Sequence, residues 1–147
     1  MPARRQLRAQ GDGLGWRLWL IGSVVATAFH LWALYRPAGP SALRWLPNAD
    51  KLGHAIIFGL PLLLILIAVG SRRRALGRRP TGRFVWITAA VFAGHAILSE
   101  WIQHRFYSER VGDPYDVVAD CTGCALAVLG YAWVDRRWTG HVEVGQA

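Results

Sequence analysis

The feature that most constrains this chain is a series of four apolar stretches, each long enough to cross a lipid bilayer. They cover residues 18–35, 52–70, 84–102 and 117–134. A helix of about 20 residues spans the roughly 30 Å of hydrocarbon in a bilayer. The stretches exceed ordinary strand lengths and lack a strict period of two, so we expect helices. The sequence therefore predicts an all-α integral membrane bundle of four transmembrane helices.

The composition agrees with this class of protein. Apolar residue types make up 53% of the 147 residues, and the mean hydropathy is +0.23. Both values disfavour a water-soluble or disordered chain. The alternative to a membrane protein is a soluble helical bundle that has the tryptophans in its core. In a soluble protein, a net charge of +8 would suggest a nucleic-acid partner. Between apolar stretches, basic residues more often fix membrane orientation, so no nucleic-acid partner is predicted.

The basic residues are distributed unevenly between the two predicted membrane faces. Of the 17 Lys and Arg residues, 12 precede the first stretch, follow the fourth, or lie in the loop at residues 72–83. Short loops rich in Lys and Arg stay in the cytoplasm, so we expect both termini and this loop to be cytoplasmic. The loop should also touch anionic lipids of the inner leaflet. Five tryptophans fall at the inner boundary and three at the outer, as interfacial tryptophans do.

The predicted organisation has three parts. Residues 1–17 form a basic cytoplasmic segment, residues 18–137 form the transmembrane unit with its polar motifs at 50–130, and residues 138–147 form a short cytoplasmic tail. A signal peptide is the alternative for the N-terminal region. The first apolar stretch has 18 residues and no clean A-x-A site follows it, whereas signal peptides usually have an apolar core of about 7–15 residues. We therefore expect an uncleaved first span.

Ionisable residues gather at the predicted outer face, opposite the arginine-rich loop. Acids near helix N-termini, such as Asp50 and Asp116, are often ordinary capping residues. Glu100 and Asp120 lie inside apolar stretches, where ionisable residues are rare and usually face a bundle interior or a wet cavity. Lys51 and Arg110 are the candidate counter-charges. The predicted ligand-binding residues are Asp50, Lys51, His54, Glu100, Gln103, Arg110, Asp113, Asp116 and Asp120.

Other polar residues carry weaker signals. Cys121 and Cys124 form a C-x-x-C motif, but no second cysteine pair accompanies it. We interpret both as small residues that let membrane helices approach closely. His30 and His95 lie in apolar stretches, where we expect hydrogen-bonded core histidines rather than metal ligands.

Two sequence blocks resemble the VanZ-like family of small bacterial membrane proteins. The first, ADKLGHAIIFGLPLLL, matches the family's D-K-x-x-H opening of a span. The second, SEWIQHRFYSERVGDPYDVVADCTGCALAVLG, matches its E-x-x-Q and R-x-x-D-x-x-D patterns and its later glycine, Gly123. Asp120 stands where the family usually has Asn. The resemblance implies the bacterial cytoplasmic membrane and a link to the cell envelope and to antibiotic resistance, namely low-level resistance to the glycopeptide teicoplanin.

Three functional hypotheses follow. In the first, the outward-facing site binds a cell-envelope lipid, wall precursor or antibiotic, with Lys51 and Arg110 holding an anionic head group and without a cofactor. In the second, an intramembrane enzyme acts on a lipid-linked substrate. His54 would be its general acid/base, with Glu100 or Asp120 as orienting carboxylate or, together with Asp116, as ligands of a divalent metal. The third is an ion or proton pathway along the buried acids.

Overall fold

The computed structural model describes residues 2–36, 48–78, 81–107 and 113–143, with side chains from residue 15 to residue 138 within these ranges. These residues form four α-helices and no strand. The helices are α1 (Pro2–Tyr35), α2 (Ala49–Ala75), α3 (Gly82–Phe106) and α4 (Pro114–Glu143). The prediction of an all-α chain with four helices is confirmed. The basic segment before the first apolar stretch is helical and continuous with it, and α4 also extends beyond its apolar part.

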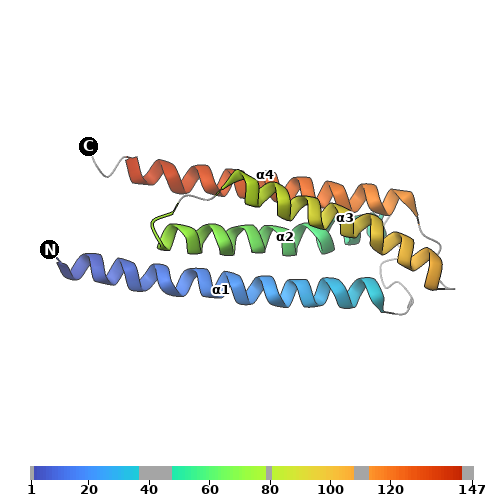
Figure 1. Ribbon diagram of the computed structural model, residues 1–147, viewed down its shortest axis with the longest axis horizontal. Helices are drawn as coiled ribbons and strands as arrows, with labels where there is room; N and C mark the ends of the chain where they lie inside the picture. The colour runs from blue at the N-terminus through green and yellow to red at the C-terminus, as the bar shows by residue number, and fades with distance from the viewer. Residues whose placement is uncertain (1, 37–47, 79–80, 108–112, 144–147) are drawn as a thin grey trace.

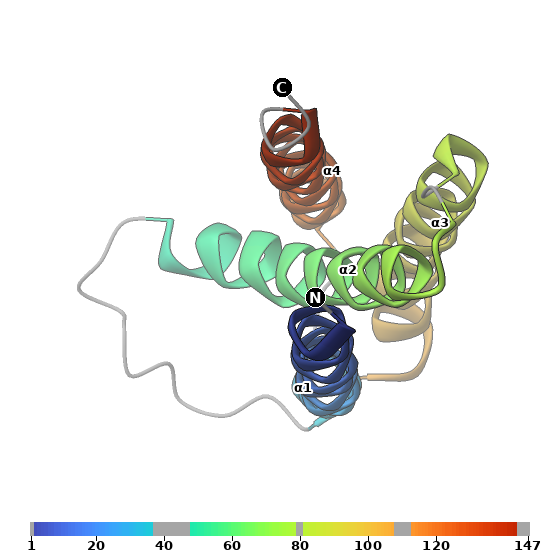
Figure 2. The same ribbon diagram turned by 90° about the vertical axis from the view of Figure 1, so that its left-hand side faces the viewer.

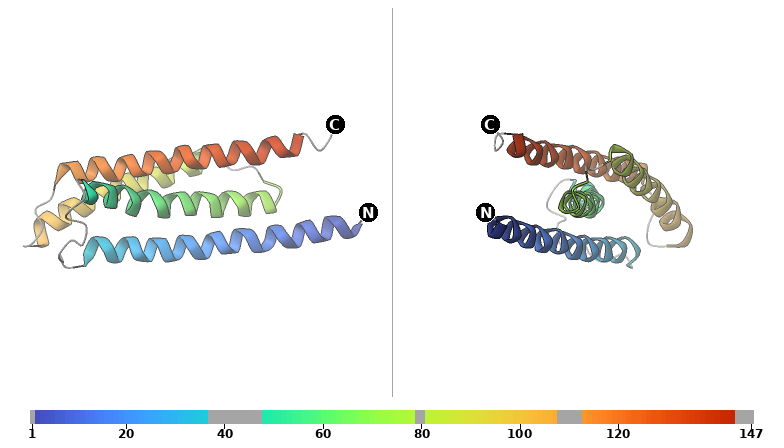
Figure 3. Two further views of the ribbon diagram at one scale, coloured as in Figure 1. Left: turned by 180° about the vertical axis from the view of Figure 1, so that it is seen from behind. Right: turned by 60° about the vertical axis from the view of Figure 1, so that its left-hand side comes forward.

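Helix α2 occupies the middle of the bundle. Its most extensive contacts are with α4 and α1, and α3 packs mainly against α4. Seen end-on, α2 lies between α1 and α4, with α3 to one side (Figure 2). The beginning of α1 and the end of α4 lie at the same end of the molecule, together with the end of α2 (Figure 1; Figure 3, left). The start of α2, the end of α3 and the start of α4 therefore meet at the other end.

All four helices are long and apolar enough to cross a membrane, over Gly15–Tyr35, Ala49–Ala75, Gly82–Phe106 and Pro114–Trp138. The tryptophans test the alternative of a soluble bundle. The side chains of Trp19, Trp32, Trp86, Trp101 and Trp133 are exposed, and Trp86 is 68% exposed. Since a soluble bundle would bury such rings in its core, this surface is typical of helices that face lipid. The chain has the architecture of a multi-pass membrane protein.

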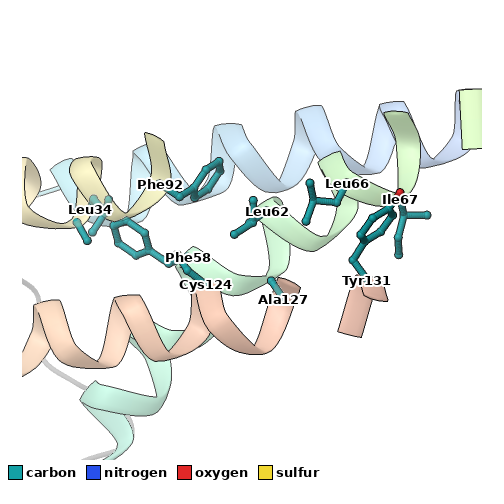
Figure 4. Packing of buried hydrophobic residues seen from close by; sticks show 10 residues of the cluster. Leu34, Phe58, Leu62, Leu66, Ile67, Phe92, Cys124, Ala127 and Tyr131 are labelled. Atoms are coloured by element: carbon teal, nitrogen blue, oxygen red, sulfur yellow. The ribbon is translucent and has the colours of Figure 1, made fainter. Parts of the chain in front are cut away.

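The apolar core runs along one side of α2. Phe58, Leu62 and Leu66 follow one another at four-residue spacing and are almost fully buried. They pack against Phe92 of α3 and Ala127 of α4 (Figure 4). Helix α2 continues through Pro61 without interruption, which membrane helices tolerate better than soluble ones. This core fixes how α2 is rotated, and therefore which way the polar residues at its start point.

A close crossing joins α2 to α4. A Cβ atom on Gly59 would lie 2.7 Å from the carbonyl oxygen of Gly123, and one on Gly123 would collide with the backbone of Ala55. Only glycine allows the two backbones to approach this closely. Ala55 adjoins His54, and Gly123 lies one turn after Asp120. The crossing therefore brings these two polar side chains together.

At the opposite end of the bundle, arginine side chains link the helices. Arg74 at the end of α2 forms an ion pair with Asp135 of α4 and lies over the ring of Trp138, 4.4 Å from its centroid. Arg72 lies over the ring of Trp16 in α1. Arg74 thus has an interhelical role beyond the predicted contact with lipids.

Candidate functional site

The polar residues predicted from separate stretches come together at the end where α2 starts, α3 ends and α4 starts. Each helix contributes at least one charged group, and α4 also brings the residue that precedes it, Asp113. The described residues of this polar cluster are Asp50, Lys51, His54, Glu100, Asp113, Asp116 and Asp120.

The ammonium group of Lys51 joins α2 to the start of α4. Its Nζ donates to Asp113 Oδ2 at 2.5 Å and to Asp116 Oδ1, and it lies 3.5 Å from Asp50 Oδ2. Three carboxylates therefore share one cation. Lys51 is thus paired with acids of the cluster, as predicted. Its ammonium group already has three carboxylate partners and is not free to bind an anionic ligand alone.

Asp113 organises the entry into α4. Its Oδ1 accepts a hydrogen bond from the backbone N–H of Tyr115 at 2.9 Å, which caps the first helical turn ahead of Pro114. Its own backbone N–H donates to Glu100 Oε2 at 3.1 Å, which ties α4 to the end of α3. The hydrogen bond from Lys51 lowers the pKa of the Asp113 carboxyl below its ordinary value. Asp113 thus stays ionised and holds Lys51 in place.

His54 lies deeper, between two carboxylates of α4. Its Nδ1 is 3.0 Å from Asp120 Oδ1, the distance of a hydrogen bond in which the imidazole N–H donates. Its Nε2 faces Asp116 Oδ2 at 3.6 Å. A carboxylate behind an imidazole fixes the orientation and tautomer of the ring. This arrangement suits both proton transfer and metal binding.

Two buried carboxyl groups complete the deep part of the cluster. Asp120 is 0% exposed and Glu100 is 7% exposed. One oxygen of each has a partner, but Glu100 Oε1 and Asp120 Oδ2 are buried without a hydrogen-bond partner among the described residues. Buried polar atoms are nearly always paired with protein, water or an ion. These two oxygens therefore indicate that a further group completes the site.

The remaining predicted site residues are placed differently. Asp50 lies at the rim, with a side chain that is 73% exposed. Gln103 is buried, and its Nε2 donates to the backbone carbonyl of Leu34 at 3.2 Å, so it ties α3 to α1. Arg110, the second predicted counter-charge, lies outside the described residues.

The polar cluster is acidic. Five carboxyl groups face one ammonium group among the residues that the structure describes. Such an excess of negative charge in a partly dry site favours a cation. That Lys51 and Arg110 together hold an anionic head group stays a prediction, because Arg110 lies outside the described residues. Among the described residues, Lys51 alone does not balance the five carboxyl groups.

A chain of hydrogen bonds below the cluster was not singled out from the sequence as a unit. Tyr35 donates to His95 Nε2, His95 Nδ1 is 3.1 Å from His30 Nε2, and His30 Nδ1 is 3.0 Å from the carbonyl oxygen of Ile57. Because the Ile57 carbonyl can only accept, His30 Nδ1–H is the donor to it. His30 Nε2 then accepts from His95 Nδ1–H, and His95 Nε2 accepts from the Tyr35 hydroxyl, so both rings are neutral. The prediction that His30 and His95 are hydrogen-bonded is confirmed; His30 is buried in the core, whereas His95 is only partly buried. Their position in two apolar stretches was the signal, but their pairing required the fold.

The cysteines of the C-x-x-C motif are both free, and Cys124 is buried in the apolar core. This burial supports the interpretation of Cys124 as a small packing residue.

Comparisons of the chain with protein-family models, with curated proteins and with solved structures found no match. The geometry of the cluster therefore carries the functional argument.

Proposed function

We propose that this chain is a multi-pass protein of the bacterial cytoplasmic membrane, of the VanZ-like type, with both termini in the cytoplasm. Its polar cluster faces outward and binds a cell-envelope component. A lipid-linked wall precursor represents this class of ligand in the test below. The observation that carries this proposal is the convergence of the polar ends of α2, α3 and α4 at one end of an apolar bundle. Polar side chains inside spanning helices are costly and usually mark a ligand or ion site.

The position of the cluster supports a ligand that lies in the membrane. The ends of α2 and α4 lie at the other end of the bundle (Figure 3), and the last turn of α2 carries Arg72, Arg73 and Arg74. If this basic end is cytoplasmic, the cluster lies at the outer boundary, where lipid-linked wall precursors present their head groups. The resemblance to a family linked to teicoplanin resistance points to the same location.

The test is binding of a purified lipid-linked wall precursor to the full chain in lipid nanodiscs, followed by native mass spectrometry. We expect binding to the unaltered chain and a loss of about tenfold or more in Asp116→Asn, because Lys51 loses the α4 carboxylate that positions its ammonium group, an effect that outweighs the removal of one negative charge from the cluster. Asp135→Asn removes a carboxylate from the other end of α4 and serves as the matched control. Equal binding by all three proteins would contradict the proposal.

A cellular readout accompanies the binding measurement. Expression of the chain in a teicoplanin-sensitive bacterium should raise the inhibitory concentration of teicoplanin, and Asp116→Asn at equal membrane abundance should not. If the chain binds the precursor but the inhibitory concentration does not change, the chain is a precursor-binding protein that does not confer resistance.

The second candidate is an enzyme that acts on the lipid-linked substrate, and the His54–Asp120 contact at 3.0 Å favours it. A carboxylate-oriented imidazole is the usual arrangement of a general acid/base. Release of a product from the precursor, lost in His54→Gln while precursor binding is retained, would support the enzyme. Retained binding without any product from the unaltered chain would support a binding protein.

A further inference from the structure

We propose that His54, Glu100 and Asp120 bind one divalent transition-metal ion, Zn²⁺ or Mn²⁺, in the deep part of the polar cluster. The sequence left a metal only as one option of the enzyme hypothesis, with Asp116 among its ligands. The inference goes beyond the proposed function, because such an ion site exists whether or not a head group binds.

The geometry of the three side chains supports this site. One potential ligand atom from each of His54, Glu100 and Asp120 lies within 4.8 Å of the other two. Bonds of about 2.0–2.2 Å to Zn²⁺ hold the ligand atoms about 3 to 4 Å apart. The group therefore needs only a small contraction to close around an ion, and the three residues come from three different helices.

The unpartnered oxygens point independently to a bound cation. Glu100 and Asp120 are each more than nine-tenths buried. Their oxygens Glu100 Oε1 and Asp120 Oδ2 lack a partner among the described residues. Two buried carboxylates next to each other repel, and a cation between them removes both the repulsion and the unpaired oxygens. Lys51 does not fill this role, because its contacts are to Asp50, Asp113 and Asp116.

The second nitrogen of His54 supports the same assignment. As a metal ligand, Nδ1 would give up the N–H that it otherwise donates to Asp120 Oδ1, and the ring proton would then lie on Nε2, which faces Asp116 Oδ2 at 3.6 Å. Histidine ligands of metals commonly direct their other ring nitrogen at a carboxylate, which orients the ring. A second group, Asp50 with His54 and Asp116, also has atoms within 4.8 Å. Its carboxylates already contact Lys51, so we assign the ion to the deeper group.

The ligand types select the metal. One imidazole and two carboxylates combine the preferences of Zn²⁺ and Mn²⁺, whereas Ca²⁺ and Mg²⁺ prefer oxygen ligands alone. Three protein ligands leave positions open on the ion for water or for a phosphate oxygen. The ion would thus supply the positive charge that an acidic cluster needs in order to hold an anionic head group.

The experiment uses the full chain in nanodiscs, stripped with a chelator and then loaded with Zn²⁺ alone or Mn²⁺ alone. We expect about one ion per chain by elemental analysis, and Glu100→Gln and Asp120→Asn should each weaken binding about tenfold or more. Asp135→Asn is the control for charge, and Cys121→Ser with Cys124→Ser is the control for a thiol site. No retained ion, unchanged binding in Asp120→Asn, or loss in the cysteine variant would overturn the proposal.

A spectroscopic measurement on the unaltered chain covers the case in which a variant fails to fold. Mn²⁺ bound at this site should show coupling to a single imidazole nitrogen in pulsed electron paramagnetic resonance. A spectrum with no nitrogen coupling would overturn the assignment of His54. Since neither measurement includes the wall precursor, a failure here is distinct from a failure of the proposed head-group function.

Discussion

Lys51 is the residue on which the rim of the polar cluster depends. Its ammonium contacts three carboxylates from two segments of the chain. Asp50 belongs to α2, Asp113 immediately precedes α4, and Asp116 lies in the first turn of α4. Without this cation, Asp50 and Asp113 would have no ion-pair partner among the described side chains, and Asp116 would keep only His54 Nε2 at 3.6 Å. Lys51 therefore stabilises the docking of α4 on α2 as well as shaping the site.

We expect Lys51→Met to destabilise the chain. Removing one partner of a buried ion pair costs about 3–5 kcal/mol, and because the Lys51 side chain is 31% exposed, we expect about 1–2 kcal/mol. The measurement is thermal or denaturant unfolding of the full chain in detergent. Asp116→Asn in the Lys51→Met background should recover part of the loss, because one unpaired carboxylate is gone.

Arg105→Met is the control for Lys51→Met, because it removes an exposed cation from the same end of the bundle. Its unfolding should change by no more than about 0.5 kcal/mol. A Lys51→Met protein as stable as the Arg105→Met protein would show that the three-carboxylate contact does not contribute to folding.

Among the elements, α2 and α4 determine the site through their close crossing. The crossing places Gly123 against the backbone of Ala55 and so sets the distance between His54 and Asp120. Helices in membranes gain little from burying apolar side chains against each other, because lipid is equally apolar. Close contact between small residues is therefore a principal source of their association.

We expect Gly123→Ala to destabilise the bundle by about 1–3 kcal/mol, the usual range for overpacking. The added Cβ collides with backbone rather than with a flexible side chain, so the helices must move apart. The substitution should also weaken metal binding, because His54 and Asp120 separate. Unfolding in detergent and the Zn²⁺ titration measure the two effects.

Gly94→Ala on α3 is the matched control, since nothing lies within 4 Å of its added Cβ. Higher helix propensity should leave this variant neutral or stabilise it by up to about 1 kcal/mol. If Gly123→Ala behaves like Gly94→Ala, the close crossing does not hold α2 and α4 together.

At the scale of the whole molecule, the bundle has two chemically different ends. One end carries the arginines with their tryptophan and Asp135 contacts, and the other carries the acidic cluster. Basic residues near short loops are retained in the cytoplasm. This polarity predicts that the acidic cluster opens to the outer side of the membrane.

Thiol labelling of the full chain tests this orientation. In a Cys121→Ser and Cys124→Ser background, a membrane-impermeant maleimide should label Tyr115→Cys in intact cells and Leu76→Cys only after permeabilisation. Both side chains are exposed, at the two ends of the bundle. Labelling of Leu76→Cys in intact cells would reverse the proposed topology and place the cluster in the cytoplasm.

The amino-acid sequence by itself determined the number of helices, their membrane character and the end of each helix at which polar residues lie. Hydropathy and charge decide how deep each residue of a helix lies in the membrane, and this depth does not depend on the neighbouring helices. For this reason Asp50, Glu100 and Asp116 could be assigned to one end of the bundle from the sequence.

Only the tertiary structure decided which side chains meet, because rotation about each helix axis depends on close packing with neighbouring helices. Gln103 matched the motif pattern but bonds Leu34, and the histidines of α1 and α3 form a separate chain with Tyr35. The contact of His54 with Asp120 follows from the glycine crossing of α2 and α4. The position of the second unpartnered carboxyl group, Glu100, depends in addition on how α3 packs against α4.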